Sequence, residues 1–343
     1  MRKLLNTLFV CTPDAYLSIE GETVLVSKKE EELLRVPLHN IEGIVTFGYT
    51  GASPALIGEC AKRGILLSFC NMYGRFLASV IGEVHGNVHL RRTQYRIADD
   101  EQQSLRIAQN ILIGKLHNCR WVLERATRDH HQRINVERVK KVGKQIFQSM
   151  LNVRSTQLYS SLLGIEGEAA SLYFSVFDEL ILQNKKEFFF HERSRRPPMD
   201  NINALLSFVY MLLVHDVSSA LAAVGLDPFV GFLHKDRPGR RSLALDLLEE
   251  LRAPLADRFV LSFVNTRQID PSCFTQKENG AVFISDNARR KLLSVWHERK
   301  QEIIQHPFIK EKIEWGLVPY VQALLLARHL RGDLDEYPPF LWK

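Results

Sequence analysis

The chain contains few cysteines, and those present form no recognised motif. Five cysteines are spread over 343 residues, and no two of them stand in a C-x-x-C pair. Structural zinc sites and disulfide frameworks are built from closely spaced cysteines, so the sequence indicates neither. An odd number of scattered thiols suits a reducing environment, and we therefore expect a cytoplasmic protein.

Several motifs of well-known enzyme classes are also absent. The sequence has no Walker A loop, no G-x-G-x-x-G after a strand, no H-E-x-x-H and no G-x-S-x-G. These absences argue against nucleotide hydrolysis, hydride transfer, zinc-dependent proteolysis and α/β-hydrolase chemistry.

Long apolar runs are missing as well. We find none that approaches the roughly 18 residues of a membrane-spanning helix. The apolar segment Leu4–Cys11 follows two basic residues, but it is short and has no small-residue cleavage site after it, so we interpret it as a strand. The sequence therefore predicts a soluble protein without membrane association.

The overall composition is that of an ordinary globular protein. With 343 residues and 45% hydrophobic content, the chain is long enough for two domains with a sizeable core. The formal net charge of +6 modestly favours an anionic partner such as nucleic acid.

The residue pattern changes from strand-like to helical near residue 87. Before that point, short β-branched and aromatic runs alternate with turns, and one helix is expected between Pro54 and Gly64. After it, helical periodicity dominates. We predict an α+β protein with a β-rich N-terminal domain (1–86) that serves dimerisation, a linker (87–100) and a larger all-α catalytic domain (101–343). The predicted helices are Gln102–Arg128, Gln132–Met150, Ser155–Leu182, Ile202–Val224, Ser242–Asp257, Asp286–Trp296 and Ile309–Leu330, and a hairpin is expected around Asn279-Gly280.

Glu166 lies on an otherwise apolar helical face. Helical spacing places it with Ala169, Ala170 and Tyr173. A carboxylate on such a face requires a partner, commonly a cation or a metal. Alternatively, Glu166 lies in the first turn of its helix, where the helix dipole favours acidic residues.

His234 stands where an apolar segment meets a strongly basic loop. It follows Gly231–Leu233 and precedes the loop Lys235–Arg241. A histidine in this position can be a metal ligand, a general base or a phosphate contact, or it can be half-buried and bonded to the backbone.

The helix expected after this loop carries Asp246, Glu249 and Glu250 opposite its apolar stripe. Acids on that side commonly face water. Beside a cationic loop they can instead hold a divalent cation in a cleft for a phosphodiester. A second basic block, which includes Arg195 and Arg196, precedes the helix that Asp200 or Asn201 is expected to cap; it can also be a solvated linker.

The order of these segments resembles the CRISPR-associated integrase family, whose members insert new spacers into the CRISPR array. The resemblance extends over essentially the whole chain. The segments Phe47–Pro54 and Leu90–Tyr95 are similar to members from type I-C systems.

The resemblance implies a metal site formed by Glu166, His234 and Glu249, with Asp246 as a supporting acid. Mg²⁺ or Mn²⁺ would bind there, and the 3′-hydroxyl of incoming DNA would attack a phosphodiester. The expected DNA contacts are Lys235, Arg237, Arg240, Arg241, Arg195 and Arg196. The resemblance further implies double-stranded DNA as substrate, a homodimer and a small ferredoxin-like companion protein.

Two alternative functions remain open at this point. One is a stand-alone metal-dependent DNase or junction-cleaving nuclease, which would leave nicked instead of joined DNA. The other is a non-catalytic nucleic-acid scaffold, whose DNA binding would depend neither on divalent metal nor on Glu166.

Overall fold

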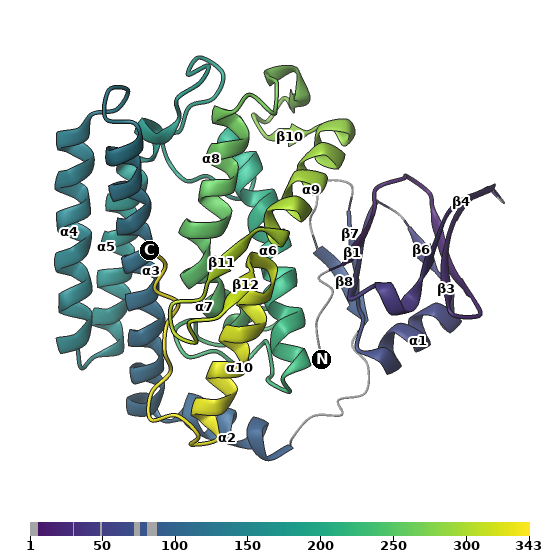
Figure 1. Ribbon diagram of the computed structural model, residues 1–343, viewed down its shortest axis with the longest axis horizontal. Helices are drawn as coiled ribbons and strands as arrows, with labels where there is room; N and C mark the ends of the chain where they lie inside the picture. Colours follow the sequence, from purple (N-terminus) through teal and green to yellow (C-terminus); the bar gives the residue numbers. More distant parts are fainter. Residues whose placement is uncertain (1–5, 30, 49, 72–75, 81–87) are drawn as a thin grey trace. The chain divides into compact units, whose positions relative to one another are not determined.

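The computed structural model describes residues 6–29, 31–48, 50–71, 76–80 and 88–343. The chain forms two compact units (Figure 1). The N-terminal unit comprises Met1–Gly86 and Asp286–Glu302, and the helical unit comprises Asn87–Ser285 and Ile303–Lys343. The predicted α+β architecture, with strands first and helices after them, is confirmed. The segment Asp286–Glu302 belongs to the N-terminal unit, although the sequence analysis assigned it to the catalytic domain.

The first sheet of the N-terminal unit has the strand order β1-β5-β7-β8. Strands β1 (Thr7–Val10), β5 (Gly43–Phe47) and β7 (Leu66–Cys70) run parallel, and β8 (Phe76–Val80) pairs antiparallel with β7. Strands β7 and β8 form a hairpin, and most of its turn lies outside the described residues.

The second sheet has the order β4-β3-β2-β6. Strands β2 (Tyr16–Glu20), β3 (Thr23–Lys28) and β4 (Glu31–Pro37) form an antiparallel meander, and the short β6 (Gly51–Ala52) pairs parallel with β2. A short 3₁₀ turn, η1 (Leu38–Asn40), follows the meander.

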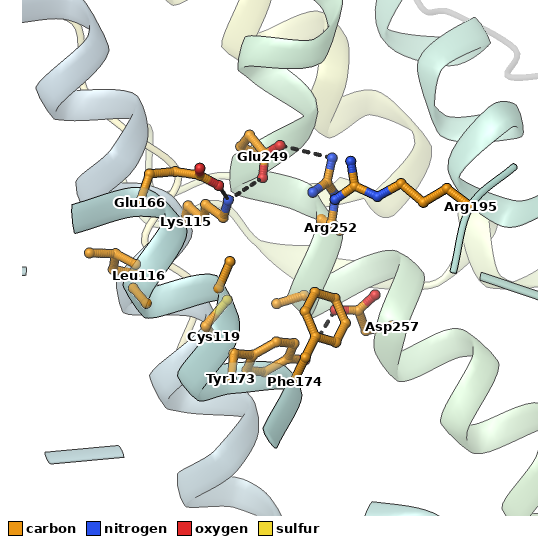
Figure 2. Close-up of a pocket in the computed structure, with 13 residues that line it drawn as sticks. Lys115, Leu116, Cys119, Glu166, Tyr173, Phe174, Arg195, Glu249, Arg252 and Asp257 are labelled. Carbon is orange, nitrogen blue, oxygen red and sulfur yellow. Dashed lines mark hydrogen bonds and ion pairs between the residues drawn. The ribbon is translucent and has the colours of Figure 1, made fainter. Parts of the chain in front are cut away.

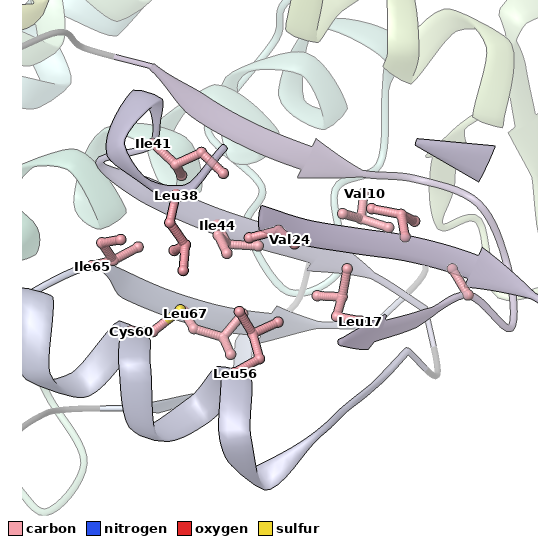
Figure 3. Packing of buried hydrophobic residues seen from close by; sticks show 12 residues of the cluster. Val10, Leu17, Val24, Leu38, Ile41, Ile44, Leu56, Cys60, Ile65 and Leu67 are labelled. Atoms are coloured by element: carbon pink, nitrogen blue, oxygen red, sulfur yellow. The ribbon is translucent and has the colours of Figure 1, made fainter. Parts of the chain in front are cut away.

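Helix α1 (Pro54–Arg63) completes the core of the N-terminal unit. The Ser53 side chain caps its first turn, and Gly64 ends it in the left-handed conformation at φ 67°, as the sequence predicts. Figure 3 shows the apolar cluster shared by the helix and both sheets. Its members include Val10, Ile44 and Leu67 from the first sheet, Leu17 and Val24 from the second, and Leu56 and Cys60 from α1.

Helix α9 (Asp286–Gln301) also belongs to the N-terminal unit and extends beyond the predicted end at Trp296. Trp296 is fully buried. The Arg289 guanidinium lies 5.8 Å from the centroid of the Phe47 ring, so the helix contacts β5 through a cation–π pair.

Three long helices form one side of the helical unit (Figure 1). These are α3 (Glu101–Asp129), α4 (Val136–Ser155) and α5 (Tyr159–Ser175). The predicted linker 87–100 is itself helical over α2 (Val88–Asp99), and Asp100 caps α3 through its carboxylate. Helix α5 ends earlier than predicted, and the 3₁₀ turn η2 (Phe177–Leu180) follows it.

Helix α6 (Asn201–Ala223) is the central apolar helix of this unit, and Asp200 caps it. By length and composition α6 could span a membrane, which corrects the statement that no apolar stretch reaches that length. It is 67% buried over its most apolar window and packs against α7 and α10, as expected for a core helix.

A continuous helical segment of 24 residues follows the basic loop. It consists of α7 (Ser242–Leu251), a π-helical stretch η3 (Arg252–Asp257) and α8 (Arg258–Asn265). The sequence pattern predicts its start correctly but ends it at Asp257, eight residues too early. Stretches of π-helix occur frequently at functional sites.

The C-terminal part contains two short hairpins and a last helix. The turn η4 (Pro271–Cys273) precedes the hairpin of β9 (Phe274–Gln276) and β10 (Val282–Ile284), which is at the predicted place. The hairpin of β11 (Ile303–Gln305) and β12 (Lys312–Glu314) and the turn η5 (Trp315–Leu317) were not predicted. The prediction that the last helix begins at Ile309 is therefore wrong: α10 (Val318–Leu330) begins at Val318, with Pro319 in its first turn.

Candidate functional site

Two carboxylates from different helices meet at one buried ammonium group. Lys115 of α3 forms an ion pair with Glu166 of α5, and its Nζ also lies 3.0 Å from Oε2 of Glu249 on α7. Figure 2 shows the three side chains pointing toward one another from their helices. Two of the three predicted metal ligands are thus brought together, around a lysine that the sequence analysis did not identify.

Glu249 is ionised although it is only 3% exposed. Burial alone would raise the pKa of its carboxyl group, but the positive charges of Arg252, Lys115 and His234 outweigh that effect and hold the pKa at about 2. The Arg252 guanidinium lies 2.8 Å from Oε1. Oε2 is buried and pairs with the Lys115 ammonium at 3.0 Å.

Glu166 lies in the middle of its helix, not at its start. Because α5 begins at Tyr159, the alternative that the helix dipole explains Glu166 is wrong. The predicted helical face is confirmed: Glu166, Ala169, Ala170 and Tyr173 line one cavity together with Glu249. The cavity has a volume of about 30 Å³, which is enough to hold water. The Glu166 side chain is 29% exposed, so solvent reaches the site from its side.

His234 is oriented by Asp246, the acid predicted to support the site. Oδ1 of Asp246 lies 2.7 Å from Nδ1 of His234 and accepts a bond from the His234 backbone N–H at 2.9 Å. Oδ2 accepts the backbone N–H groups of Phe232 and Leu233 at 2.6 and 2.9 Å. Both carboxylate oxygens of Asp246 are therefore bonded to the loop. The Nε2 atom of His234 is the ring nitrogen available to a ligand.

The acids of α7 do not face water. Asp246, Glu249 and Glu250 are all buried, which corrects the solvent-facing alternative. Glu250 accepts bonds from the Tyr337 hydroxyl at 2.8 Å and from the Phe340 backbone N–H at 2.7 Å. The C-terminal segment therefore covers the side of α7 that the sequence pattern left polar.

A second buried charge lies at the far end of the cavity. Asp257, the last residue of η3, accepts bonds from the hydroxyls of Tyr173 and Tyr210. Burial raises the pKa of Asp257 to about 6. The Arg252 guanidinium lies 4.9 Å from the centroid of the Tyr210 ring, which connects Asp257 and Glu249 into one polar network.

The predicted DNA-binding residues occupy two places. Lys235, Arg237, Arg240 and Arg241 lie in the loop that follows His234 and leads into α7. The Lys235 ammonium lies 4.3 Å from the centroid of the Tyr159 ring.

The other two predicted DNA contacts precede α6. Both are exposed, and Arg195 also lines the cavity and extends toward Arg252 in Figure 2. Their neighbour Arg193 is tied to Asn203 at 2.6 Å and to Ser207 at 3.1 Å, so its role is structural.

The donor groups fit a hard divalent cation, although the three predicted ligands are not assembled around one point. Within the described ranges, no three His, Cys, Asp or Glu side chains lie close enough to hold a metal. The two carboxylates nevertheless converge on one cation, the Lys115 ammonium, and Oε2 of Glu249 is buried beside it. Carboxylate oxygens with one imidazole nitrogen form a donor set suited to Mg²⁺ or Mn²⁺.

Sequence reasoning missed Lys115 and Arg252. The signal for Lys115 is a single lysine within the apolar run Ile111–Leu116, which a buried helix tolerates only when the charge is paired. Arg252 gives no comparable signal, because an arginine one turn after two glutamates is ordinary on an exposed helix.

Comparison with known proteins identifies the family. The sequence model described as CRISPR associated protein Cas1 matches residues 8–298. The chain is 50% identical to CRISPR-associated endonuclease Cas1 1 of Chlorobaculum tepidum over the full length of both chains. It is 48% identical to CRISPR-associated endonuclease Cas1 2 of Rhodospirillum rubrum, again over the full length of both.

Solved structures share the fold at lower identity. The Cas1 protein TM1797 of Thermotoga maritima superposes with a TM-score of 0.82 at 22% identity, over 95% of this chain and 97% of that one. A casposase bound to its integration product gives 0.84 at 21% identity, over 98% and 94%. A Cas6-RT-Cas1–Cas2 complex gives 0.83 at 23% identity, over 98% of this chain and 36% of that one. With a family match over most of the sequence and close relatives along its full length, the chain belongs to the Cas1 family, the endonuclease and integrase of CRISPR adaptation.

Proposed function

We propose that the helical unit catalyses phosphodiester transfer at a divalent-metal centre formed by Glu166, Glu249 and His234. The observation that carries this proposal is the convergence of the Glu166 and Glu249 carboxylates on one cation, the Lys115 ammonium. Two carboxylates around a positive charge in a partly exposed cavity are the arrangement that a hard divalent cation requires.

Each residue has a distinct role in this proposal. Glu249 presents a buried, ionised carboxylate whose pKa of about 2 keeps it charged at physiological pH. Glu166 contributes the second carboxylate from the exposed side of the cavity. Asp246 fixes His234 with Nδ1 bonded, so that Nε2 points away as the third donor. Bound Mg²⁺ or Mn²⁺ would polarise the scissile phosphate and stabilise charge on the leaving oxygen.

The basic loop next to His234 would hold the DNA backbone. Lys235, Arg237, Arg240 and Arg241 lie between His234 and α7, where a phosphate near the metal would pass. Arg195 reaches the cavity itself and would contact the phosphate closest to the reaction, while Arg196 would contact the backbone farther out. Such contacts make DNA binding salt-dependent, with a slope of about 0.9 per neutralised phosphate on duplex DNA.

We propose double-stranded DNA, pre-spacer and CRISPR repeat, as the substrate. We also propose a homodimer formed through the N-terminal unit and a small ferredoxin-like companion protein. Support comes from relatives of the same fold: one is a casposase bound to its integration product and another a Cas1–Cas2 assembly. The five cysteines are free thiols, which agrees with a cytoplasmic location. The type I-C subtype rests on the segments Phe47–Pro54 and Leu90–Tyr95.

The proposal is tested by strand transfer of a duplex with free 3′-hydroxyls into a supercoiled plasmid that carries the repeat. Glu166→Gln should reduce joined product by about a hundredfold or more in the presence of Mn²⁺, because it removes a metal ligand. The matched control is Glu168→Gln, since Glu168 is an exposed glutamate on the same helix. Equal activity of both variants would remove Glu166 from the centre.

The same assay separates the alternative functions. An integrase yields DNA joined to the plasmid, whereas a stand-alone nuclease yields only nicked or cleaved plasmid. A non-catalytic scaffold binds the duplex equally with and without divalent metal, and Glu166→Gln leaves that binding unchanged.

A further inference from the structure

Lys115 is a lysine buried in the apolar interior of the helical unit. It lies in α3 within the apolar run Ile111–Leu116, and its side chain is only 6% exposed. A buried lysine loses both hydration and side-chain freedom, so it is found in a core only where ion pairs compensate. The compensating groups here are Glu166 and Glu249.

The two oxygens of Glu249 are used differently. Oε1 is bound by Arg252 at 2.8 Å, and this contact holds the side chain in place. Oε2 is buried and lies 3.0 Å from the Lys115 ammonium. On its other side, the ammonium contacts Glu166. The ammonium therefore lies between the two oxygen donors that the proposed metal centre would use.

A divalent cation and this ammonium cannot share the position. Mg²⁺ binds carboxylate oxygens at about 2.0–2.1 Å, so a metal bound by both Glu166 and Glu249 would take the space between them that the Lys115 ammonium occupies. Two cations in contact inside a protein also repel each other far more strongly than in water.

We propose that Lys115 is an internal counter-ion of the Cas1 metal centre: its ammonium occupies the cation position between Glu166 and Glu249 in the metal-free protein and is displaced when the divalent metal binds. This inference rests on the proposed function. Lys115 keeps two carboxylates assembled that would otherwise repel each other, and it weakens metal binding because the metal must displace it. The side chain is a positioning residue and a competitor, not a ligand.

The test is Mn²⁺ binding to the full-length metal-free protein, measured by titration calorimetry, together with thermal unfolding in the presence and absence of Mn²⁺. Lys115→Met should bind Mn²⁺ more tightly by about tenfold or more, because no cation competes for the carboxylates. Without metal the variant should unfold at a lower temperature than the unmodified protein, since a buried carboxylate loses its partner. Added Mn²⁺ should raise the unfolding temperature of the variant again. The control is Lys140→Met, an exposed lysine on α4, which should change neither quantity.

A second variant keeps the test decisive if Lys115→Met does not fold without metal. Lys115→Gln is uncharged but can still donate a hydrogen bond to a carboxylate, and it should also gain Mn²⁺ affinity. Equal affinity of the unmodified protein and both variants would overturn the counter-ion role while leaving the metal centre intact. Mn²⁺ binding to none of the three would instead contradict the metal centre itself, and the inference with it.

Discussion

Asp246 shows how one buried carboxylate can fix the conformation of a loop. It accepts the backbone N–H groups of Phe232, Leu233 and His234 and also bonds the His234 ring. Three consecutive N–H groups that point at one anion form a concave nest, and here the anion is supplied by the protein. The direction of the His234 ring therefore depends on Asp246.

Asp246→Asn should destabilise the protein by about 2–4 kcal/mol, because an amide presents its N–H₂ to backbone donors and leaves buried groups unsatisfied. Since the histidine loses its orienting partner, Mn²⁺ affinity should fall by about tenfold to a hundredfold. Chemical denaturation and calorimetry measure the two effects. His234→Ala should lose metal affinity but remain within about 1 kcal/mol of the parent in stability, since that side chain is partly exposed. An Asp246→Asn variant as stable as the parent would refute this role.

Substitution of glycine by alanine should have opposite effects on stability at two positions of the helical unit. A Cβ on Gly231 would lie 2.8 Å from Oδ2 of Asp246 and 2.8 Å from the Ser242 backbone, whereas a Cβ on Gly143 in α4 meets nothing within 4 Å. Gly143→Ala should stabilise the protein by about 0.5–1 kcal/mol, because alanine is the better helix former. Gly231→Ala should destabilise it and reduce strand transfer, since it displaces the carboxylate that holds His234.

Thermal unfolding of the two variants side by side tests this pair. A gain for Gly231→Ala, or a clear loss for Gly143→Ala, would contradict the packing described around each glycine.

At the scale of single residues, the sequence identified the acids but not their partners. Glu166, Asp246 and Glu249 stand out because each belongs to an ordered motif. Lys115 precedes Glu166 by 51 positions and Glu249 by more than a hundred, and no local pattern links a lysine in one helix to acids in two others. The contact exists only because α3, α5 and α7 pack together.

At the scale of elements, the C-terminal segment connects the two helices that carry Lys115 and Glu249. Asn118 of α3 donates to the backbone carbonyls of Glu250 at 2.6 Å and Phe340 at 2.8 Å, and it accepts the Trp342 N–H at 2.9 Å. Tyr337, Phe340 and Trp342 are buried against these helices. The segment after α10 is therefore a structural part of the site's scaffold.

Asn118→Ala should cost about 2–4 kcal/mol of stability, because it leaves two buried carbonyls and one buried N–H without partners. It should also reduce strand transfer, since α3 and α7 lose a direct connection next to Lys115 and Glu249. Denaturant unfolding with an activity assay measures both. The exposed Arg128→Ala on the same helix is the control and should stay within about 0.5 kcal/mol of the parent. An equally small effect of Asn118→Ala would show that the C-terminal segment does not hold the helices together.

The same C-terminal segment explains why the polar face of helix α7 is buried and does not face water. Apolar periodicity correctly predicts a helix from Ser242 and one buried stripe. It cannot reveal that the opposite face is covered, because Tyr337 and Phe340 lie about ninety positions farther along the chain.

At the scale of the whole molecule, the buried side chain of His306 predicts how the stability of the fold depends on pH. His306 is fully buried, its Nδ1 accepts the backbone N–H groups of Phe308 and Ile309, and its Nε2 lies 3.2 Å from the Gln322 side-chain oxygen. Burial, with the nearby charge of Lys310, lowers the pKa of His306 from 6.5 to about 4. The folded protein therefore keeps this ring neutral over a range in which the unfolded chain protonates it.

Because the unfolded state binds the proton first, this group stabilises the fold fully above pH 6.5, and the contribution is lost as the pH falls toward 4. The loss should be on the order of 3 kcal/mol across that window. His306→Gln should remove this part of the pH dependence, which is measured as the difference between the two denaturation curves at each pH. Parallel curves for parent and variant between pH 7 and 4 would contradict the assignment.

The broad architecture was accessible from the sequence because it depends on local signals. Strand and helix periods, Pro54 and Gly64 at the ends of α1, the cap at Asp200 and the ordered motifs were sufficient for the α+β fold and the family. The assignment of α9 to the N-terminal unit was not accessible, because an amphipathic helix does not indicate which unit covers its apolar side.

The central claim is that Glu166, Glu249 and His234 hold one divalent cation in the place that Lys115 occupies without it. The most direct measurement is anomalous X-ray diffraction at the manganese edge from crystals of the full-length protein grown with Mn²⁺. We predict one peak bound by a carboxylate oxygen of Glu166, Oε2 of Glu249 and Nε2 of His234, with the Lys115 ammonium moved away. Manganese bound elsewhere, or Lys115 still bridging both carboxylates at saturating Mn²⁺, would contradict the account.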